Sequence, residues 1–444
     1  MQILAVNPWI YDFAAYDLWL KPLGLLQIAG ALRSLGCRVN LIDCLDRHHP
    51  GLKSYYKRGI PRNKQYGCGN YYNEVITKPF CLRQIPRRYK RYGFPLVLFE
   101  EEVKRLPPPE VILVSSGMTY WYPGVFEAIS RLKQRFPEVP LILGGIYATL
   151  CYHHASRYCG ADFISQGGDI RKLVKLIGKV TGKNLPEKDL TTNSPGYPAY
   201  DLYSRNDYIA LRTSVGCPFN CSYCAVNLLS RGFEQRPPGQ VVEEIEYFYK
   251  GHGVKNFVFY DDALLFREEE HFQEIGRLIA DRGLNCYFHT PNGLHARFVS
   301  EDTARLMKEM GFILPRLSLE TINPERQMTT GGKVSTGELK EAMKSLRKAG
   351  YSPGEVGVYL MMGMPGQEMP EVRETIQFVH SLGAKVLLVE YSPIPGTRDW
   401  ELSGLEPDLD PLLHNNSLFP LYPLSEWKNF QELKDEAHRL NTVT

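Results

Sequence analysis

The sequence predicts a two-part α/β protein: an open, doubly wound parallel sheet followed by a partial barrel of six βα units. β-rich runs alternate with runs of helical apolar spacing in both halves, which is typical of parallel sheets covered by helices. The second half repeats its strand–helix step at roughly 30–50-residue intervals, as βα barrels do. With 43% hydrophobic and 23% charged residues among 444, the composition excludes wholesale disorder, a coiled coil and a collagen-like fibre.

The first predicted domain covers residues 1–182. Its strands are expected at 3–7, 37–43, 111–115, 141–144 and 161–165, and its helices at 23–35, 125–135, 147–158 and 170–181. Residues 183–207 are rich in Pro, Asn, Ser and Thr, which predicts a linker.

The second predicted domain covers residues 208–400, and 401–444 form a C-terminal extension. Strands are expected near 208–215, 256–261, 285–290, 313–320, 355–362 and 385–392, and helices near 239–251, 268–282, 301–310, 335–349 and 369–382. In such a barrel the chemistry is expected at the C-terminal ends of the strands.

A basic, tyrosine-rich insert interrupts the first domain at residues 45–95. It contains 12 Lys or Arg residues and seven Tyr residues, against only Asp46 and Glu74. Such a mixture can form a nucleic-acid surface. The alternative that we favour is a solvated insert that caps an active site or contacts an acidic partner, because no known nucleic-acid-binding module appears elsewhere.

The remaining bulk features predict a cytoplasmic protein without a membrane partner. No apolar run reaches the roughly 18 residues that cross a bilayer, and the N-terminus lacks the basic region of a signal peptide. The net charge of +3 is too small to imply a nucleic-acid partner for the whole chain. In a reducing compartment, clustered cysteines indicate metal or redox chemistry rather than disulfides.

Three of the ten cysteines form a tight group just after the first strand of the second half. Cys217, Cys221 and Cys224 follow a Cys-x3-Cys-x2-Cys spacing. A four-iron cluster is held by thiolates and normally takes four, so three cysteines leave one iron open to an exchangeable ligand. The alternative is a zinc knuckle that takes a distant His or Cys as its fourth ligand.

With Tyr223 at the aromatic position, this loop resembles the signature of the radical S-adenosylmethionine (SAM) enzymes. The resemblance implies that Cys217, Cys221 and Cys224 ligate a [4Fe-4S] cluster, and that SAM chelates the fourth iron. It implies reductive cleavage of SAM to a 5′-deoxyadenosyl radical that abstracts a hydrogen from a substrate. It also implies an electron donor such as flavodoxin or ferredoxin. The substrate and the residues that act on it are not identified.

Further segments match this family in order. Asp261 and Asp262 end the second strand, where the family holds the methionine amino group of SAM; a helix N-cap is the alternative reading. Tyr223 would flank the adenine.

On the fourth strand, Arg316, Ser318 and Glu320 share one face by period-2 alternation. The family places contacts to the ribose and methionine of SAM there. Gly363 lies in a segment that resembles the glycine-containing fifth strand near adenine.

The first half resembles the cobalamin (B12)-binding-type domain that precedes the radical SAM barrel in one large subgroup. Gly144 and Gly145 follow a strand and are the candidates for lining a cobalamin tail pocket. Asp46-Arg-His48-His-Pro-Gly51 fits the Asp-x-His-x-x-Gly pattern of cobalt-ligating domains, but it follows the second strand rather than the first. A loop histidine is therefore the favoured interpretation of His48.

Three functions follow from these patterns. The leading one is a radical SAM enzyme, with cobalamin-dependent methyl transfer left open as its reaction. The second is a radical SAM enzyme that catalyses a rearrangement or oxidation without cobalamin. The third is a non-catalytic Fe-S or zinc protein that binds RNA through the basic insert.

Overall fold

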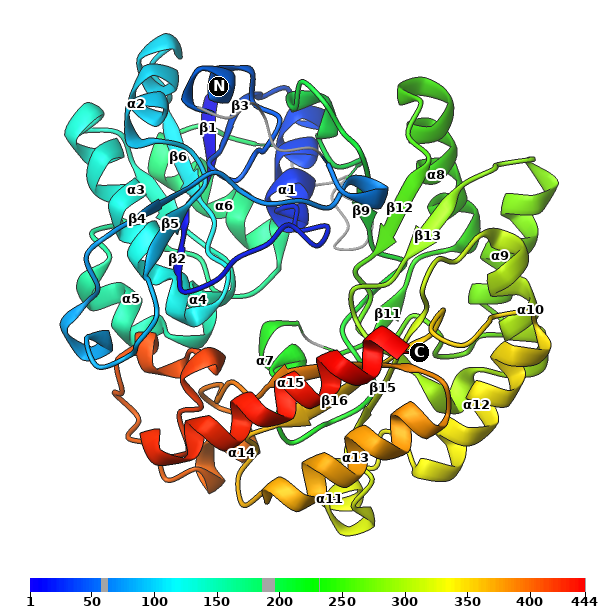
Figure 1. Cartoon of the computed structure of the whole chain (residues 1–444). Coiled ribbons are helices and arrows are strands. Elements are labelled where there is room, and N and C mark those ends of the chain that lie inside the picture. The colour runs from blue at the N-terminus through cyan, green and yellow to red at the C-terminus, as the bar shows by residue number, and fades with distance from the viewer. Residues whose placement is uncertain (57–62, 186–195, 231, 444) are drawn as a thin grey trace. The chain divides into compact units, whose positions relative to one another are not determined.

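The computed structural model describes residues 1–56, 63–185, 196–230 and 232–443. The chain divides into two compact units (Figure 1). The first comprises Met1–Asp207 and Pro407–His414, and the second comprises Tyr208–Glu406 and Asn415–Thr444. The predicted extension 401–444 is thus shared between the two units.

The first unit contains a five-stranded parallel sheet in the order β3-β1-β6-β7-β8. The strands are β1 (Gln2–Asn7), β3 (Arg38–Asp43), β6 (Val111–Val114), β7 (Leu141–Leu143) and β8 (Phe163–Ile164). The helices are α1 (Leu23–Ser34), α2 (Leu96–Arg105), α3 (Tyr122–Arg135), α4 (Ile146–Leu150), α5 (Tyr152–Tyr158) and α6 (Ile170–Thr181).

Both faces of this sheet are buried, because alternate side chains of each strand join different cores. Leu4 and Val6 of β1 pack in the core with α2 and α3, whereas Ile3 and Ala5 pack in the core with α1 and α6. This arrangement is the predicted doubly wound sheet. The described part of the predicted linker also belongs to this unit, since Tyr200 is fully buried and the Ala199 amide donates to the Leu26 carbonyl (3.1 Å).

The basic insert contributes two strands to a small antiparallel sheet that sequence periodicity does not reveal. This sheet has the order β2-β5-β4, with β2 (Ile10–Asp12), β4 (Asn73–Val75) and β5 (Lys90–Tyr92). Tyr71 and Tyr92 of the insert are buried against Ile10. Part of the insert is therefore core rather than solvated surface, and residues 57–62 lie outside the described residues.

The second unit contains the predicted partial barrel. Its strands are β9 (Ile209–Leu211), β10 (Ser214–Val215), β11 (Glu234–Gln235), β12 (Asn256–Phe259), β13 (Tyr287–His289), β14 (Leu294–His295), β15 (Arg316–Glu320), β16 (Gly357–Met362) and β17 (Lys385–Glu390). Its helices are α7 (Val226–Leu229), α8 (Pro238–His252), α9 (Phe272–Asp281), α10 (Glu301–Met310), α11 (Pro324–Thr329), α12 (Thr336–Lys348), α13 (Met369–Ser381), α14 (Arg398–Leu402) and α15 (Trp427–Val443).

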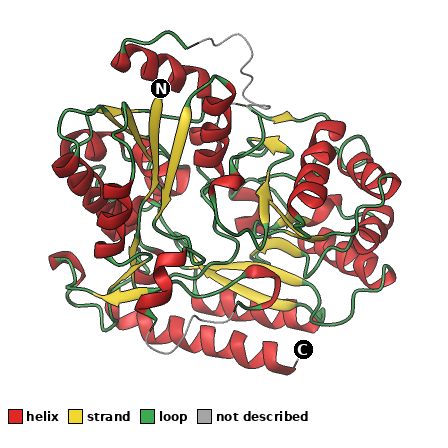
Figure 2. Cartoon of the chain, turned by 90° about the horizontal axis from the view of Figure 1, so that it is seen from above, coloured by secondary structure: helices red, strands yellow, loops and turns green. Residues whose placement is uncertain are grey.

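The barrel strands form two parallel segments, β13-β12-β9 and β14-β15-β16-β17. An isolated parallel bridge joins Phe288 of β13 to Phe312, which precedes β15. Helices flank the strands of each unit (Figure 2). The outer edge of β17 is covered by α15, where the Asn441 side chain pairs with both the amide and the carbonyl of Val386 (2.8 Å each). The C-terminal helix thus bonds the backbone of one residue on the strand edge that an open barrel would otherwise expose.

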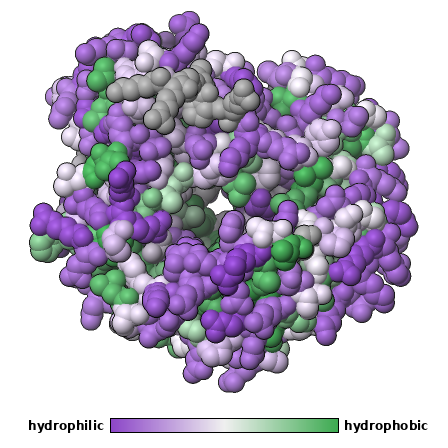
Figure 3. Space-filling model, in the orientation of Figure 1, coloured by the Kyte–Doolittle hydropathy of each residue, from purple (hydrophilic) through white to green (hydrophobic). Residues whose placement is uncertain are grey.

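Hydrophilic side chains predominate on the face of the molecule drawn in Figure 3. Among the described residues, no helix combines the length and the apolar character needed to span a bilayer.

Candidate functional site

The three-cysteine loop joins β10 to α7, and backbone hydrogen bonds attach it to the rest of the unit. It begins at Gly216, whose φ is +81° and where a Cβ would come within 1.9 Å of the Gly232 carbonyl oxygen, so only glycine fits. The Ser222 amide donates to the Thr330 carbonyl (3.2 Å), and the Asp399 amide donates to the Ser222 carbonyl (3.0 Å). The loop is therefore fastened to segments from two distant parts of the same unit.

The thiols of this loop lie in one electrostatic environment. Burial raises the pKa of Cys217, Cys221 and Cys224. Charge on neighbouring thiols raises it further for Cys217 and for Cys224, whose pKa reaches about 11, and the charge of Glu320 raises it further for Cys221. The ammonium of Lys333 acts in the opposite direction on Cys217 and Cys221. Three crowded thiolates thus require additional positive charge. The described residues include no group of three His, Cys, Asp or Glu side chains placed to hold a single metal ion.

Four polar side chains form a cluster at the loop: Tyr223 of the loop itself, Ser318 and Glu320 of β15, and Lys333. The Tyr223 hydroxyl donates to the Glu320 carboxylate (3.3 Å), and the Lys333 ammonium lies 3.8 Å from the same Glu320 oxygen. Lys333 also donates to the Ser318 hydroxyl (2.9 Å). Tyr223, Ser318 and Glu320 were predicted here from sequence, whereas Lys333 was missed. The only local signal for Lys333 is the preceding Gly331-Gly332 pair, which allows the chain to turn with positive φ.

The three predicted polar residues of β15 have different partners. The register of the strand shifts between Ser318 and Glu320, and Glu320 has a φ of +67°, which is uncommon for a residue with a side chain. Ser318 and Glu320 both meet Lys333. Arg316 instead donates to the Tyr359 hydroxyl (2.8 Å), and that hydroxyl donates to the Pro291 carbonyl (2.7 Å).

The two adjacent acids after β12 have different surroundings. The Asp261 carboxylate is buried and accepts bonds from the Thr213 amide (3.0 Å to each oxygen), the Thr213 hydroxyl (2.8 Å) and the Ser214 hydroxyl (2.6 Å). It therefore ties the end of β12 to the β9–β10 junction. Within the described part of the chain Asp262 receives no hydrogen bond, and burial together with the Asp261 charge raises its pKa to about 6. Asp262 also acts electrostatically on Cys217 and Cys224.

The loop after β16 contains Gly363, which has a φ of +85° and lies beside Phe419 of the C-terminal segment. The loop is fixed by a clamp centred on Arg326 of α11. This guanidinium donates to the carbonyls of Pro365 and Gly366 (2.9 Å each) and pairs with Glu371 (2.9 Å).

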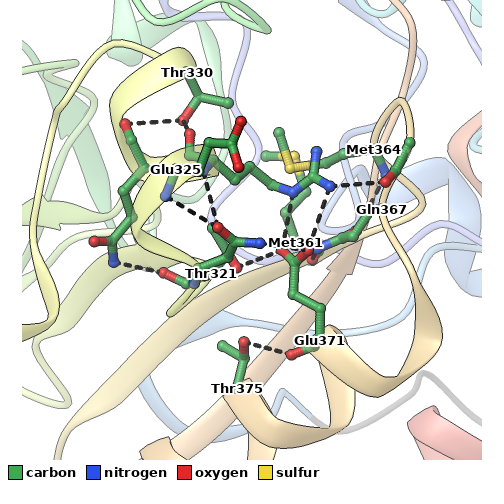
Figure 4. Close-up of polar contacts among 12 residues, drawn as sticks. Thr321, Glu325, Thr330, Met361, Met364, Gln367, Glu371 and Thr375 are labelled. Carbon is green, nitrogen blue, oxygen red and sulfur yellow. Dashed lines mark hydrogen bonds and ion pairs between the residues drawn. The ribbon is translucent and has the colours of Figure 1, made fainter.

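The clamp extends to neighbouring side chains (Figure 4). The Thr321 hydroxyl donates to Glu371 (2.6 Å), and the Gln367 side chain donates to the Met361 carbonyl (3.0 Å). The clamp thereby joins the end of β15 to the end of β16.

In the first unit, polar and small residues gather at the C-terminal edge of the parallel sheet. Asn7 donates to Asp43 (2.7 Å), and the Tyr203 hydroxyl donates to the other Asp43 oxygen (2.6 Å). Gly144 is half-buried and Gly145 is exposed. Gly145 has a φ of +99°, and a Cβ there would lie 2.3 Å from the Ser116 carbonyl oxygen.

His48 is engaged within the first unit. Its Nε2 lies 2.9 Å from the Asp207 carboxylate, and both side chains are 15% exposed. His48 is thus a partly buried, paired histidine of a loop rather than a fully solvated one.

Ion pairs with nearby carboxylates neutralise part of the positive charge of the insert. Arg47 pairs with Asp17 (2.7 Å), and Arg91 pairs with Glu74; both arginines are buried. Arg88 is exposed, and the Arg87 guanidinium lies over the Phe13 ring (5.4 Å). The surface charge is therefore smaller than the composition of the insert suggests.

Comparison with known proteins gives consistent matches. Residues 211–379 match the family model of the radical SAM superfamily. An uncharacterized methyltransferase of Pyrococcus horikoshii is 28% identical over 329 residues, which cover 66% of this chain and 69% of that protein. The hopanoid C-3 methylase of Methylococcus capsulatus is 22% identical over 428 residues, which cover 90% of this chain and 72% of that protein.

Two solved structures share the fold over most of the chain. The radical SAM methyltransferase TsrM of Kitasatospora setae, solved with tryptophan and a SAM analog, has a TM-score of 0.64 at 16% identity, covering 90% of this chain and 74% of its own. The cobalamin-dependent SAM radical enzyme OxsB has a TM-score of 0.58 at 12% identity, covering 94% of this chain and 56% of its own. These matches confirm the predicted fold class for both halves of the chain.

Proposed function

We propose that this chain is a methyltransferase that cleaves SAM reductively and uses cobalamin as a second cofactor, because residues 211–379 match the family model of the radical SAM superfamily and the fold is similar to that of TsrM. The observation that carries the SAM chemistry is the cysteine loop with Asp262, Glu320 and Lys333 in one electrostatic environment. Enzymes of this superfamily need a reductant and a substrate. We further propose flavodoxin or ferredoxin as the electron donor and the cytoplasm as the compartment.

The donor set fits an iron–sulfur cluster. Cys217, Cys221 and Cys224 would hold it, and the positive charge of iron would stabilise the thiolates that burial and nearby negative charge disfavour. When bound, the cluster supplies the electron for cleavage of SAM into methionine and a 5′-deoxyadenosyl radical. The backbone bonds of the loop to Thr330 and Asp399 hold the three thiols in place.

The polar cluster at the loop fits the charged end of SAM. An ammonium and a carboxylate need partners of opposite sign, and Asp262 and Lys333 provide one of each. Asp262 is the better ammonium partner of the acid pair, because the Asp261 carboxylate already accepts hydrogen bonds from three protein donors. Glu320 holds Lys333 and Tyr223 in position.

Two observations support cobalamin in the first unit. The exposed Gly145 and the half-buried Gly144 leave room at the sheet edge for a large ligand to approach the backbone. The structural neighbours TsrM and OxsB are described with cobalamin bound. A bound corrinoid supplies methyl-transfer chemistry. His48 has no assigned part in holding cobalt, since it is paired with Asp207.

Anaerobic purification tests the proposal directly. We expect iron and sulfide together with a corrinoid absorption band, and SAM cleavage once a reductant is added. Replacing Cys217, Cys221 and Cys224 together with Ala should remove the iron and all SAM cleavage, whereas replacing the exposed Cys81 should leave both intact. Iron and sulfide without corrinoid would contradict the methyltransferase proposal, and a triple variant that keeps its iron would contradict the cluster assignment.

A further inference from the structure

His295 of β14 lies on the same face of the barrel sheet as the SAM-binding candidates. It is the parallel register partner of Ser318, and paired residues of neighbouring strands point to the same side of a sheet. Gly293, two residues earlier, supports this placement, because a Cβ there would lie 2.1 Å from the Ser318 hydroxyl oxygen. His295 thus adjoins the Ser318–Lys333 pair.

The same imidazole touches the cysteine loop. It stacks on Phe219, which lies between Cys217 and Cys221, with 4.7 Å between ring centroids and 28° between the ring planes. His295 is 2% exposed, and burial, together with the charge of Lys333, lowers its pKa to about 2. The ring is therefore neutral and carries one hydrogen-bond donor and one acceptor.

The Nε2 atom of His295 is buried without a hydrogen-bond partner among the described residues. A second orphan on the same segment is the Thr290 hydroxyl. The buried His271 of the same unit bonds the Arg236 carbonyl through its Nε2 (2.9 Å), although its Nδ1 is also buried without a partner among the described residues. What sets His295 apart is its position beside the Ser318–Lys333 pair and the cysteine loop. A buried polar atom without a partner is unfavourable and rare, so its presence beside a binding site indicates a partner that arrives with the ligand.

We propose that His295 is a SAM-binding residue, whose Nε2 hydrogen-bonds a polar group of SAM while its ring packs on Phe219 of the cysteine loop. The inference rests on the proposed function, because it requires that this unit binds SAM. It adds a contact from β14, the short strand that follows the third strand of the barrel, to those expected from the second and fourth strands. It also links SAM binding to the position of the loop, since one side chain contacts both.

The test is the variant His295→Phe, which keeps a flat ring for stacking and removes both nitrogens. We expect the dissociation constant of SAM, measured by calorimetry on the anaerobically purified full chain, to rise about tenfold, which corresponds to about 1.4 kcal/mol. The melting temperature without SAM should stay the same or rise, because the orphaned polar atom is gone. A structural histidine would give the opposite pattern, a lower melting temperature with unchanged SAM affinity.

Two further variants complete the design. His271→Phe, in the same unit, should lower the melting temperature and leave SAM affinity unchanged, because it breaks a bond that the protein already makes. If His295→Phe does not fold, His295→Leu gives the same comparison with a smaller side chain. Wild-type protein that fails to bind SAM would refute the proposed function, whereas equal SAM affinity in wild type and variant would refute the role of His295 alone.

Discussion

Replacing Glu320 with Gln removes one negative charge from the SAM site while keeping the shape of the side chain. Glu320 is partly buried and has two partners, the Tyr223 hydroxyl at 3.3 Å and the Lys333 ammonium at 3.8 Å. The amide oxygen of Gln can still accept from Tyr223, but Lys333 loses its counter-charge. The variant therefore tests the electrostatic part of the site.

The size of the effect follows from these distances. Two unit charges 3.8 Å apart attract by about 4 kcal/mol at an effective dielectric constant of about 20, before desolvation is subtracted. Hydrogen bonds to charged groups contribute about 1.5–3 kcal/mol net. If loss of the counter-charge weakens the interaction of Lys333 with SAM by this free energy, the affinity for SAM falls about 10- to 100-fold.

The assay is SAM binding by the reconstituted protein, with iron content measured in parallel. Iron should be unchanged, because Glu320 is not among the thiol ligands. The matched control is Glu244→Gln, since Glu244 is a buried acid of the same unit that pairs with Arg236 at 2.6 Å. It should destabilise the protein without weakening SAM binding. Unchanged affinity in Glu320→Gln, or an equal loss in both variants, would refute the reasoning.

Three further predictions concern other parts of the molecule. The pKa of Asp262 is raised to about 6 from 3.8, so the stabilisation that the protonated carboxyl provides is present below about pH 4 and is lost as the pH rises through 6. The free energy of unfolding of the apoprotein in urea should therefore decrease by about 3 kcal/mol over this range. Asp262→Asn should abolish this decrease. Gly145→Ala should destabilise the chain by about 1–3 kcal/mol in the same assay because of its positive φ and the contact with Ser116, whereas Gly168→Ala, with no atom within 4 Å, should be neutral. Double replacement of Arg87 and Arg88 with Ala should leave RNA retention unchanged between 50 and 200 mM salt; a wild-type log–log slope of about −0.7 per phosphate that the variant flattens would instead identify a nucleic-acid surface.

The regular elements of both units could be predicted from sequence because they depend on local periodicity. The amphipathic pattern of 170–181 coincides with α6, and the apolar run at 111–115 differs from β6 by one residue. The short strands β4 and β5 could not be found this way, because each is three residues long. β5 pairs antiparallel with β2, far away in the sequence, and β4 pairs antiparallel with β5. Their core is made by tyrosines, which sequence reasoning assigned to a surface.

In the candidate site, too, the features that depend on local sequence could be predicted and those that depend on distant contacts could not. The cysteine spacing is local and was found from sequence. Lys333 was not found, because its meeting with Ser318 and Glu320 depends on the turn at Gly331-Gly332 and on the register shift in β15. The sequence also could not show which of Asp261 and Asp262 is available to bind the ammonium group of SAM. The answer depends on hydrogen bonds to Asp261 from Thr213 and Ser214, which lie on another part of the chain.

The cysteine motif also depends on residues outside it. A Cβ at Gly216 would lie 1.9 Å from the Gly232 carbonyl oxygen, and a Cβ at Gly331 would lie 3.1 Å from the Cys221 Cα. Gly331 is separated from the motif by more than a hundred residues, yet its φ of +113° lets the α11 segment approach the loop and accept the Ser222 amide. A side chain at either glycine would push the loop away from this support while leaving all three cysteines in place. The spacing of the thiols is therefore necessary for the site, and the close approach of these two backbone segments is what gives the thiols a fixed position.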